Sequence, residues 1–242
     1  MWNGAWRDNA VSGVDSGTIP AAPAIVMSNA ATYGYTPIAV FGWRSGTTLF
    51  LKLPANATNT WANTEAKAAF QSMLVSFATT YQPRFLFIGN ENDFFYEQDP
   101  TDYARWITFY NAAYTAIKTV SAGTQIGPIF NFEHLAGVGT LNAWTTPNWS
   151  ALTTHDLTKV DIVGVTVYPW FSYATVATVP DTYLQPLFDH VGAIPVAITE
   201  SGWPAENLAN LNPLWSTSEQ EQVDYITKLF GFAQGHNVQM VN

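Results

Sequence analysis

Short apolar runs alternate along the chain with longer segments of helical periodicity. Apolar runs without polar alternation are typical of strands buried on both faces, as in a parallel sheet. Segments with apolar residues three and four positions apart are typical of helices that pack one face on such a sheet. The runs predict six parallel strands, over residues 37–43, 84–89, 125–130, 160–167, 195–199 and 237–241.

The segments between these runs predict helices with ordinary start and stop signals. Asn63 offers a capping oxygen to the second of them, and Gly34 is a common stop after the first. The helices are predicted over residues 23–33, 64–81, 102–120, 149–157, 180–190 and 216–234. Strands and helices in alternation predict an α/β protein, either an open doubly wound sheet or a closed (β/α) barrel. No glycine-rich phosphate-binding motif follows a strand, which weakens the nucleotide-binding forms of the open sheet.

Composition excludes several classes of function. The 242 residues include nine Lys and Arg against eighteen Asp and Glu, for a net charge of −9. Nucleic acids and anionic membranes are bound through basic patches, so neither is an expected partner. The absence of cysteine excludes disulfides and thiolate chemistry, and the four histidines lack metal-ligand spacing, so no cofactor is expected. An extracellular location is favoured, although residues 1–4 do not resemble a secretory signal.

Three carboxylates lie at the ends of predicted strands. They are Glu91, Glu133 and Glu200. The working groups of a (β/α) barrel lie where strands end and loops begin. A carboxylate there is costly unless it is hydrogen-bonded or functional, and a single one could equally hold a loop. Glu91 and Glu200 together favour the carboxyl pair that cleaves glycosidic bonds, in which one group protonates the leaving oxygen and the other attacks carbon or activates water.

These residues carry a resemblance to a known group of enzymes. Asn90-Glu91, and Glu200 within the run Thr199 to Pro204, resemble the clan A glycoside hydrolases, most nearly the β-1,3-glucanase and β-1,4-galactanase branches. The resemblance implies a retaining (β/α)₈ enzyme, with Glu91 as acid/base after the fourth strand and Glu200 as nucleophile after the seventh. The two lie 109 residues and three strand steps apart. Tyr168 matches the position that orients the nucleophile by a hydrogen bond.

Further residues near the strand ends are candidates for binding sugar. Aromatic rings stack on sugars through an apolar face, and polar side chains hydrogen-bond to hydroxyl groups. The candidates are Asn90, Tyr168, Trp170, Trp203, Glu133, Trp43 and Arg44. Trp170 and Trp203 are favoured as stacking platforms because they adjoin Tyr168 and Glu200. Each ring could instead be packing only, and Glu133 could equally stabilise its loop.

The N-terminal part departs from the resemblance. If Glu91 follows the fourth strand, only 36 residues precede the third, whereas two strand–helix units need about 60 at roughly 30 residues each. The family's arginine near the nucleophile has only Arg7 and Arg44 as candidates. The sequence therefore predicts one barrel domain over residues 1–242, incomplete at the N-terminus, with about six or seven of the eight strands; residues 1–6 could hold one of them.

Three functions follow, in order of preference. The first is a retaining β-glycosidase with a carbohydrate substrate, and the second is a weak or inactive barrel that binds carbohydrate. The third, an α/β esterase, loses support because the chain has no G-x-S-x-G motif. An incomplete barrel exposes unpaired strand edges, which invite pairing with another chain. The sequence therefore predicts either a homo-oligomer or a segment of the same chain that covers the gap.

Overall fold

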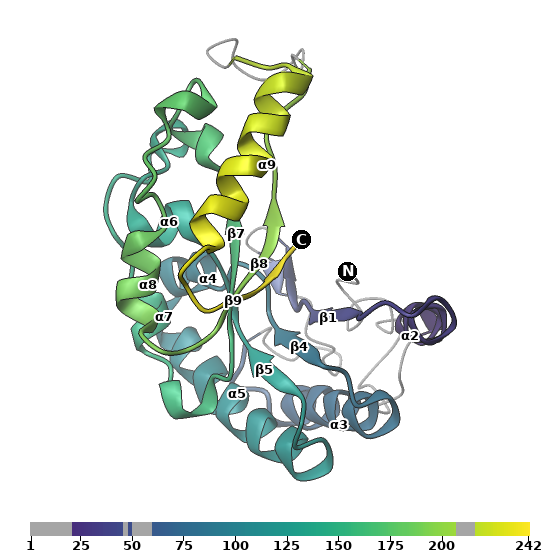
Figure 1. Cartoon of the computed structure of the whole chain (residues 1–242). Helices are drawn as coiled ribbons and strands as arrows, with labels where there is room; N and C mark the ends of the chain where they lie inside the picture. The colour runs from purple at the N-terminus through teal and green to yellow at the C-terminus, as the bar shows by residue number, and fades with distance from the viewer. Residues whose placement is uncertain (1–20, 46–47, 50–59, 207–215) are drawn as a thin grey trace. The chain divides into compact units, whose positions relative to one another are not determined.

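A computed structural model describes residues 21–45, 48–49, 60–206 and 216–242. The chain divides into two compact units. Unit 1 comprises Met1–Pro128 and Thr154–Asp161, and unit 2 comprises Ile129–Thr153 and Ile162–Asn242. Figure 1 shows the elements of both units along the chain. The predicted strand at residues 1–6 lies outside the described residues, as does Arg7.

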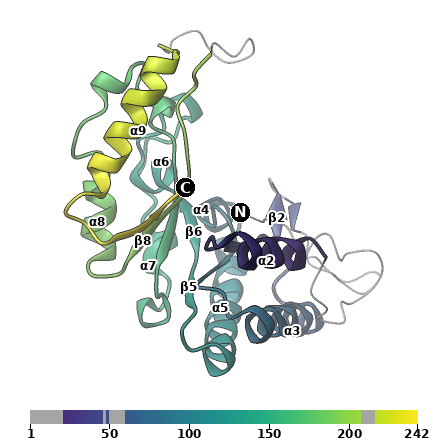
Figure 2. The ribbon, with the colours of Figure 1, turned by 45° about the vertical axis from the view of Figure 1, so that its right-hand side comes forward.

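Unit 1 is built on a three-stranded parallel sheet in the order β1-β4-β5. The strands are β1 (Ile38–Phe41), β4 (Phe85–Ile88) and β5 (Gln125–Gly127). Helices α3 (Thr64–Tyr81) and α5 (Pro100–Val120) lie side by side next to this sheet in both views of the ribbon (Figures 1 and 2). The other elements are α2 (Ala21–Tyr33), the antiparallel pair β2 (Arg44–Ser45) and β3 (Thr48–Leu49), α4 (Asp93–Gln98) and η2 (Leu157–Lys159).

The helix caps of unit 1 explain where its long helices begin. Asn63 accepts a hydrogen bond from the Ala66 amide at 2.8 Å, so α3 has the predicted bounds. Helix α5 begins two residues earlier than predicted, because Asp99 caps it by accepting from the Asp102 amide at 2.8 Å. Pro100 takes the first helical turn, where a missing N–H costs no hydrogen bond.

Aromatic rings fill the core of unit 1. The Trp43 ring lies 5.1 Å from Trp61, 4.8 Å from Phe95 and 5.5 Å from Trp106, measured between ring centroids. All three pairs meet edge to face or tilted, and such arrangements are favourable for aromatic quadrupoles. The aromatic-rich composition therefore serves packing in unit 1.

A histidine is enclosed in the same core. His155 is 4% exposed and lies against the rings of Tyr103, Trp106 and Tyr110 at 5.1–6.1 Å. Its Nε2 lies 3.1 Å from the Tyr103 hydroxyl. Burial lowers the pKa of His155 to about 3, because the apolar surroundings disfavour the charged imidazolium.

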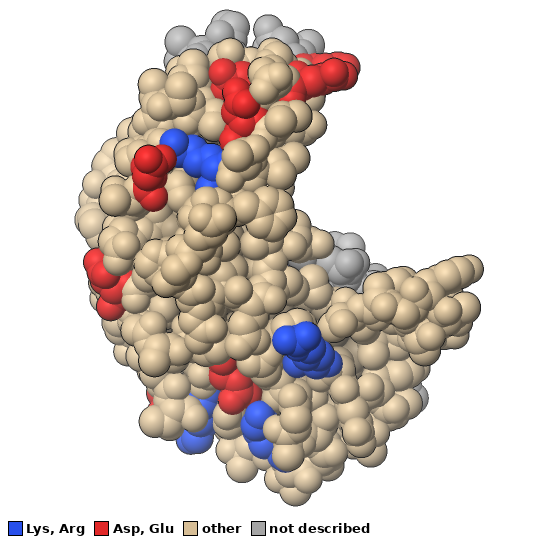
Figure 3. Space-filling model, in the orientation of Figure 1, with Lys and Arg blue, Asp and Glu red and all other residues tan. Residues whose placement is uncertain are grey.

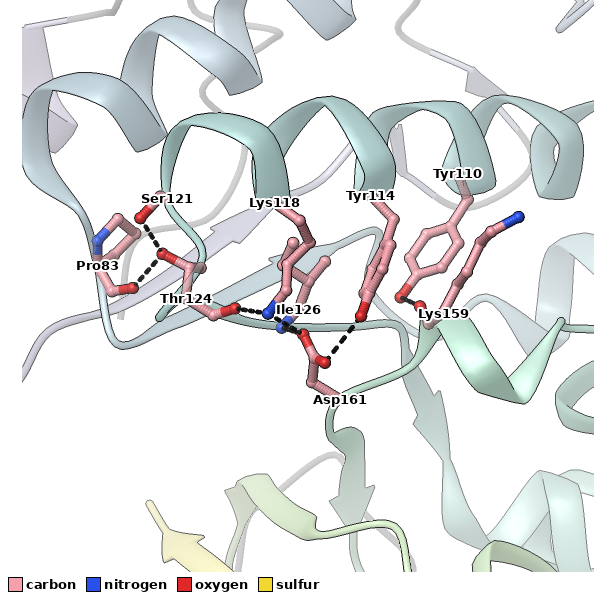
Figure 4. Close-up of polar contacts among 9 residues, drawn as sticks. All are labelled: Pro83, Tyr110, Tyr114, Lys118, Ser121, Thr124, Ile126, Lys159 and Asp161. Atoms are coloured by element: carbon pink, nitrogen blue, oxygen red, sulfur yellow. Dashed lines mark hydrogen bonds and ion pairs between the residues drawn. The ribbon is translucent and has the colours of Figure 1, made fainter.

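A polar network ties the C-terminal turn of α5 to the segment before β7 (Figure 4). Asp161 accepts from the Tyr114 hydroxyl at 2.9 Å, the Ile126 amide at 3.0 Å and the Lys118 ammonium at 3.1 Å. Lys118 also donates to the Thr124 carbonyl at 2.9 Å. Burial and the bond to Asp161 raise the pKa of Tyr114 to about 12. This network lies at the N-terminal end of β5, where barrel residues commonly serve stability.

Unit 2 is built on a four-stranded parallel sheet in the order β6-β7-β8-β9. The strands are β6 (Ile129–Asn131), β7 (Val163–Val167), β8 (Val196–Ser201) and β9 (Val238–Val241). The helices are α6 (Phe132–Ala136), α7 (Ser150–Thr153), α8 (Gln185–Val191) and α9 (Glu219–Ala233). Short 3₁₀ turns are η1 (Thr140–Asn142), η3 (Pro169–Phe171) and η4 (Val176–Thr178).

The structure corrects several predicted bounds. The strand predicted over 125–130 is two strands, β5 and β6, separated by Pro128, which has no N–H to donate. Strand β5 pairs with β4 in unit 1, and β6 pairs with β7 in unit 2. The helix predicted over 149–157 is only α7 followed by η2, and α8 begins at Gln185 rather than at 180.

Three general properties bear on function. None of the described helices is long and apolar enough to cross a membrane. Charged side chains are sparse on the face that Figure 3 shows, as the charged fraction of 11% leads one to expect. Within the described part of the chain, no group of three or more His, Asp or Glu side chains is placed to hold a metal ion.

Candidate functional site

A tight turn after β4 carries Glu91 in unit 1. Gly89 begins it with φ +84°, and a Cβ on Gly89 would lie 2.1 Å from Asn92 Oδ1. Only glycine therefore fits at this position. Asn92 is 1% exposed and donates to the Ile88 carbonyl at 3.4 Å, which folds the turn back onto the strand end.

Glu91 itself has a left-handed backbone, with φ +48°. A non-glycine residue pays on the order of 1 kcal/mol or more for this conformation, which persists only where its surroundings enforce it. Such residues cluster at active sites. The side chain is half-buried, and the Glu91 carbonyl accepts from the Phe94 amide at 3.3 Å at the start of α4. Sequence patterns do not show this strain.

Two other predicted residues lie beside Glu91 in unit 1. Burial lowers the pKa of Arg44, and the nearby charges of Asp93 and Glu91 oppose this shift only in part. Its guanidinium lies 5.8 Å from the centroid of the Phe94 ring. Asn90 Oδ1 is buried and has no hydrogen-bond partner among the described residues. Unit 1 therefore presents a carboxylate, a guanidinium and an amide oxygen near the end of β4.

A β-bulge positions Glu200 in unit 2. In the β7–β8 pairing, Val165 lies opposite Ile198 and Thr166 lies opposite Glu200, so Thr199 is an extra residue on β8. The Thr199 hydroxyl donates to the Val165 carbonyl at 3.1 Å and holds the bulge. Bulges redirect the side chains that follow them and are common beside active sites. Strand β8 therefore includes Glu200, whereas the predicted strand ends at residue 199.

Tyr168 contacts the Glu200 carboxylate from the end of the neighbouring strand. The Tyr168 hydroxyl donates to Glu200 Oε2 at 3.4 Å, and both side chains are half-buried. Tyr168 follows β7 and precedes η3. Its backbone amide donates to Glu133 Oε1 at 2.7 Å, and Glu133 is completely buried. Glu200, Tyr168 and Glu133 thus form one connected polar group in unit 2.

The predicted tryptophan platforms lie in different surroundings. Trp170 is half-buried on η3, with its ring centroid 4.2 Å from that of Phe171. Trp203 is 2% exposed, and its Nε1 donates to the Ser216 carbonyl at 3.0 Å. Trp43 is 1% exposed within the aromatic core of unit 1. In this structure Trp43 and Trp203 are therefore packed in the protein interior. Of these three tryptophans, Trp170 alone is partly accessible.

Several residues that sequence reasoning did not single out belong to these sites. Trp144 and Phe171 add half-buried rings near Trp170, with the Trp144–Phe171 centroids 5.4 Å apart. Tyr183 donates its hydroxyl to Glu133 Oε1 at 2.9 Å. Tyr183 comes from the segment before α8, and no local pattern connects it to a glutamate 50 positions earlier.

Comparisons with known proteins bear on the family and the fold. The model of the family described as "Glycosyl hydrolase family 53" matches residues 64–234. No protein with curated annotation matches the chain. Among solved structures, a β-glucosidase from Thermotoga maritima in complex with cyclophellitol is 14% identical with a TM-score of 0.59, over 90% of this chain and 66% of that one. Its complex with deoxynojirimycin is 13% identical with a TM-score of 0.62, over 98% and 71%.

The β-glycosidase BGL167 is similar at 13% identity and a TM-score of 0.64, over 98% of this chain and 70% of that one. At this level of identity the likeness shows the fold alone. It confirms the predicted (β/α)-barrel class, and the strands within the described residues are consistent with the predicted incomplete barrel. The chain spans 66% of the length of the β-glucosidase bound to cyclophellitol.

Proposed function

Because this chain belongs to glycosyl hydrolase family 53, we propose that it hydrolyses a β-linked glycoside or polysaccharide by double displacement. The observation that carries the proposal is the hydrogen bond from the Tyr168 hydroxyl to Glu200 at 3.4 Å, at the strand end where the resemblance places the nucleophile. The strained backbone of Glu91 after β4 supports its role as the second carboxyl group.

The proposed reaction has two steps. Glu91 donates a proton to the glycosidic oxygen while Glu200 attacks the anomeric carbon, which gives a glycosyl ester on Glu200. Glu91 then removes a proton from water, and that water displaces Glu200 from the sugar. Tyr168 orients the Glu200 carboxylate through its hydroxyl. Double displacement requires both glutamates.

The roles of the two glutamates predict different variant phenotypes. Glu200→Ala removes the nucleophile and should reduce turnover to background on every substrate. Glu91→Ala removes the proton donor, so it should slow polysaccharides far more than aryl glycosides whose leaving groups need no protonation. Release of reducing ends from β-galactans and β-glucans, together with aryl β-glycoside assays, measures both effects. Full activity in Glu200→Ala, or an inverted anomeric configuration in the first product seen by NMR, would refute the proposal.

A second candidate is carbohydrate binding without turnover. It needs a sugar platform such as the half-buried Trp170 and neither of the proposed catalytic roles. Under this alternative, calorimetry would show saturable binding of a β-galactan or β-glucan by the wild-type protein while no reducing ends appear. The half-buried ring of Trp170 would serve either function.

A further inference from the structure

Glu133 is a buried carboxylate that connects three segments of unit 2. It lies in the first turn of α6 and is 0% exposed, so in this structure it offers no surface to a sugar. Its Oε1 accepts from the Tyr168 amide at 2.7 Å and from the Tyr183 hydroxyl at 2.9 Å. These donors lie 35 and 50 positions away, at the end of β7 and before α8.

A buried carboxylate is costly and is kept only where hydrogen bonds compensate for its lost hydration. The short bond to the Tyr168 amide fixes the backbone exactly where β7 ends and η3 begins. The hydroxyl of that same residue donates to Glu200. Tyr168 therefore connects Glu133 to Glu200. Its amide bonds to Glu133, and its hydroxyl bonds to the proposed nucleophile.

We propose that Glu133 is a positioning residue that acts through Tyr168 to hold the orientation of Glu200. The inference rests on the proposed function for its kinetic consequences, but the contact between Glu133 and the Tyr168 amide does not. This role requires a side chain long enough to bring an acceptor oxygen to the Tyr168 amide. The charge of Glu133 is secondary, because a neutral oxygen at the same place accepts the same hydrogen bond.

Two substitutions separate reach from charge. Glu133→Gln keeps an oxygen at full side-chain length and removes the charge, whereas Glu133→Asp keeps the charge and withdraws it by one methylene. Positioning predicts that Glu133→Gln retains kcat within about threefold. It predicts that Glu133→Asp loses on the order of 10- to 100-fold in kcat with little change in KM, as small misplacements of reacting groups do. A dominant electrostatic role of Glu133 would reverse this order and overturn the proposal.

A double-variant test shows whether the effect passes through Tyr168. In a Tyr168→Phe background the hydroxyl is already absent, so adding Glu133→Asp should lower kcat by less than about twofold. The same pattern should hold for the rate at which a 2,4-dinitrophenyl 2-deoxy-2-fluoro-β-glycoside labels Glu200, because this probe reports the nucleophile with no need of an acid. Independent, multiplicative losses from Glu133→Asp and Tyr168→Phe would contradict the proposal.

Two further measurements guard against a merely structural effect. Tyr183→Phe and Tyr114→Phe each remove one tyrosine hydroxyl that donates to a carboxylate at 2.9 Å, the first to Glu133 and the second to Asp161 in unit 1. Tyr114→Phe shows how much activity follows from lost stability alone, whereas Tyr183→Phe also removes one of the hydrogen bonds that hold Glu133. Hydrogen exchange of the Tyr168 amide should be slow in wild type and Glu133→Gln and fast in Glu133→Asp. Unchanged exchange in Glu133→Asp would overturn the inference, whereas an inactive wild type would refute only the proposed function.

Discussion

At the scale of single residues, the proposed catalytic groups depend on unusual local backbone. Glu91 takes a left-handed φ of +48°, and Glu200 follows a bulge at Thr199. Neither conformation is what a helix or a regular strand would impose, and both direct a carboxylate that ordinary geometry would turn elsewhere. The fold thus uses backbone distortion to aim these two side chains.

Substitution of the tryptophans near the strand ends should have effects that depend on how buried each ring is. Trp170 is half-buried, so Trp170→Ala should raise KM or weaken polysaccharide binding by a few kcal/mol at most, with only a small change in Tm. Trp203 is 2% exposed, so Trp203→Ala should cost roughly 3–5 kcal/mol of stability instead. Calorimetric binding and thermal unfolding of both variants test this. Unchanged affinity in Trp170→Ala with a large fall in Tm would identify Trp170 as a packing residue too.

At the scale of elements, long-range polar contacts connect helices and loops to strands. In unit 1, Asp161 connects α5 to β5 through three hydrogen bonds. In unit 2, the Ser201 and Tyr225 hydroxyls contact each other and both donate to the Val167 carbonyl, which attaches α9 to the ends of β7 and β8. The Tyr225 hydroxyl is protonated at neutral pH in any case, and burial raises its pKa further.

Asp161 should contribute more than an ordinary surface acid. Asp161→Ala leaves three donors without their acceptor and should lower the free energy of unfolding by about 1–3 kcal/mol. Asp181 is a matched control, because it also pairs with a lysine, Lys228 at 2.8 Å, but its side chain is 94% exposed. Asp181→Ala should cost less than about 1 kcal/mol. Equal losses in urea unfolding of the two variants would argue against the network.

His155 predicts a pH dependence of stability. Its pKa is about 3 in the folded protein, below the ordinary value of 6.5, so the unfolded chain binds the proton more readily. The free energy of unfolding should therefore be unaffected by His155 above pH 6.5 and should fall as pH falls from 6.5 toward 3. The slope is at most about 1.4 kcal/mol per pH unit.

Urea unfolding of wild type and His155→Gln at several pH values tests this. The difference between the two proteins removes the contribution of the Glu and Asp side chains, which titrate in both. Glutamine can still bond to the Tyr103 hydroxyl but does not titrate in this range. The difference in unfolding free energy between wild type and His155→Gln should therefore change between pH 6.5 and pH 4. A difference that stays constant across this range would show that His155 is not buried in its neutral form.

At the scale of the whole molecule, unit 2 has β9 at one end of its described sheet and an exposed apolar stripe on α9. Among the described strands, β9 pairs with β8 alone. On α9, Val223, Ile226 and Phe230 are 54%, 47% and 55% exposed, at the three- and four-residue spacing of one helix face. Exposed apolar stripes and open edges favour association. Self-association of this chain stays a prediction from the sequence, and these residues are where it would be tested.

If copies of the chain associate through this stripe, light scattering should show a mass that rises with concentration. Replacing Ile226 and Phe230 together by Ser should then shift the protein toward the monomer. Ile25→Ser is the control, because Ile25 is 60% exposed but lies on α2 in unit 1. A monomer at every concentration, or an equal effect of Ile25→Ser, would contradict the prediction.

The sequence by itself determined most of what is local. The apolar runs located the parallel strands to within a few residues, because a strand buried on both faces must be apolar throughout. Helix α3 has its predicted bounds because its N-cap, Asn63, bonds to the Ala66 amide only three residues later. The places of Glu91 and Glu200 after two strands are likewise a local property of the sequence.

The tertiary structure alone decided which of these residues contact one another and which are enclosed. Trp43 and Trp203 follow strands just as Trp170 does, yet both are buried by residues distant in the sequence. Glu133 meets the Tyr168 amide and the Tyr183 hydroxyl across 35 and 50 positions. The physical reason is that periodicity and capping act over a few residues, whereas burial and hydrogen-bond partners depend on which elements pack together.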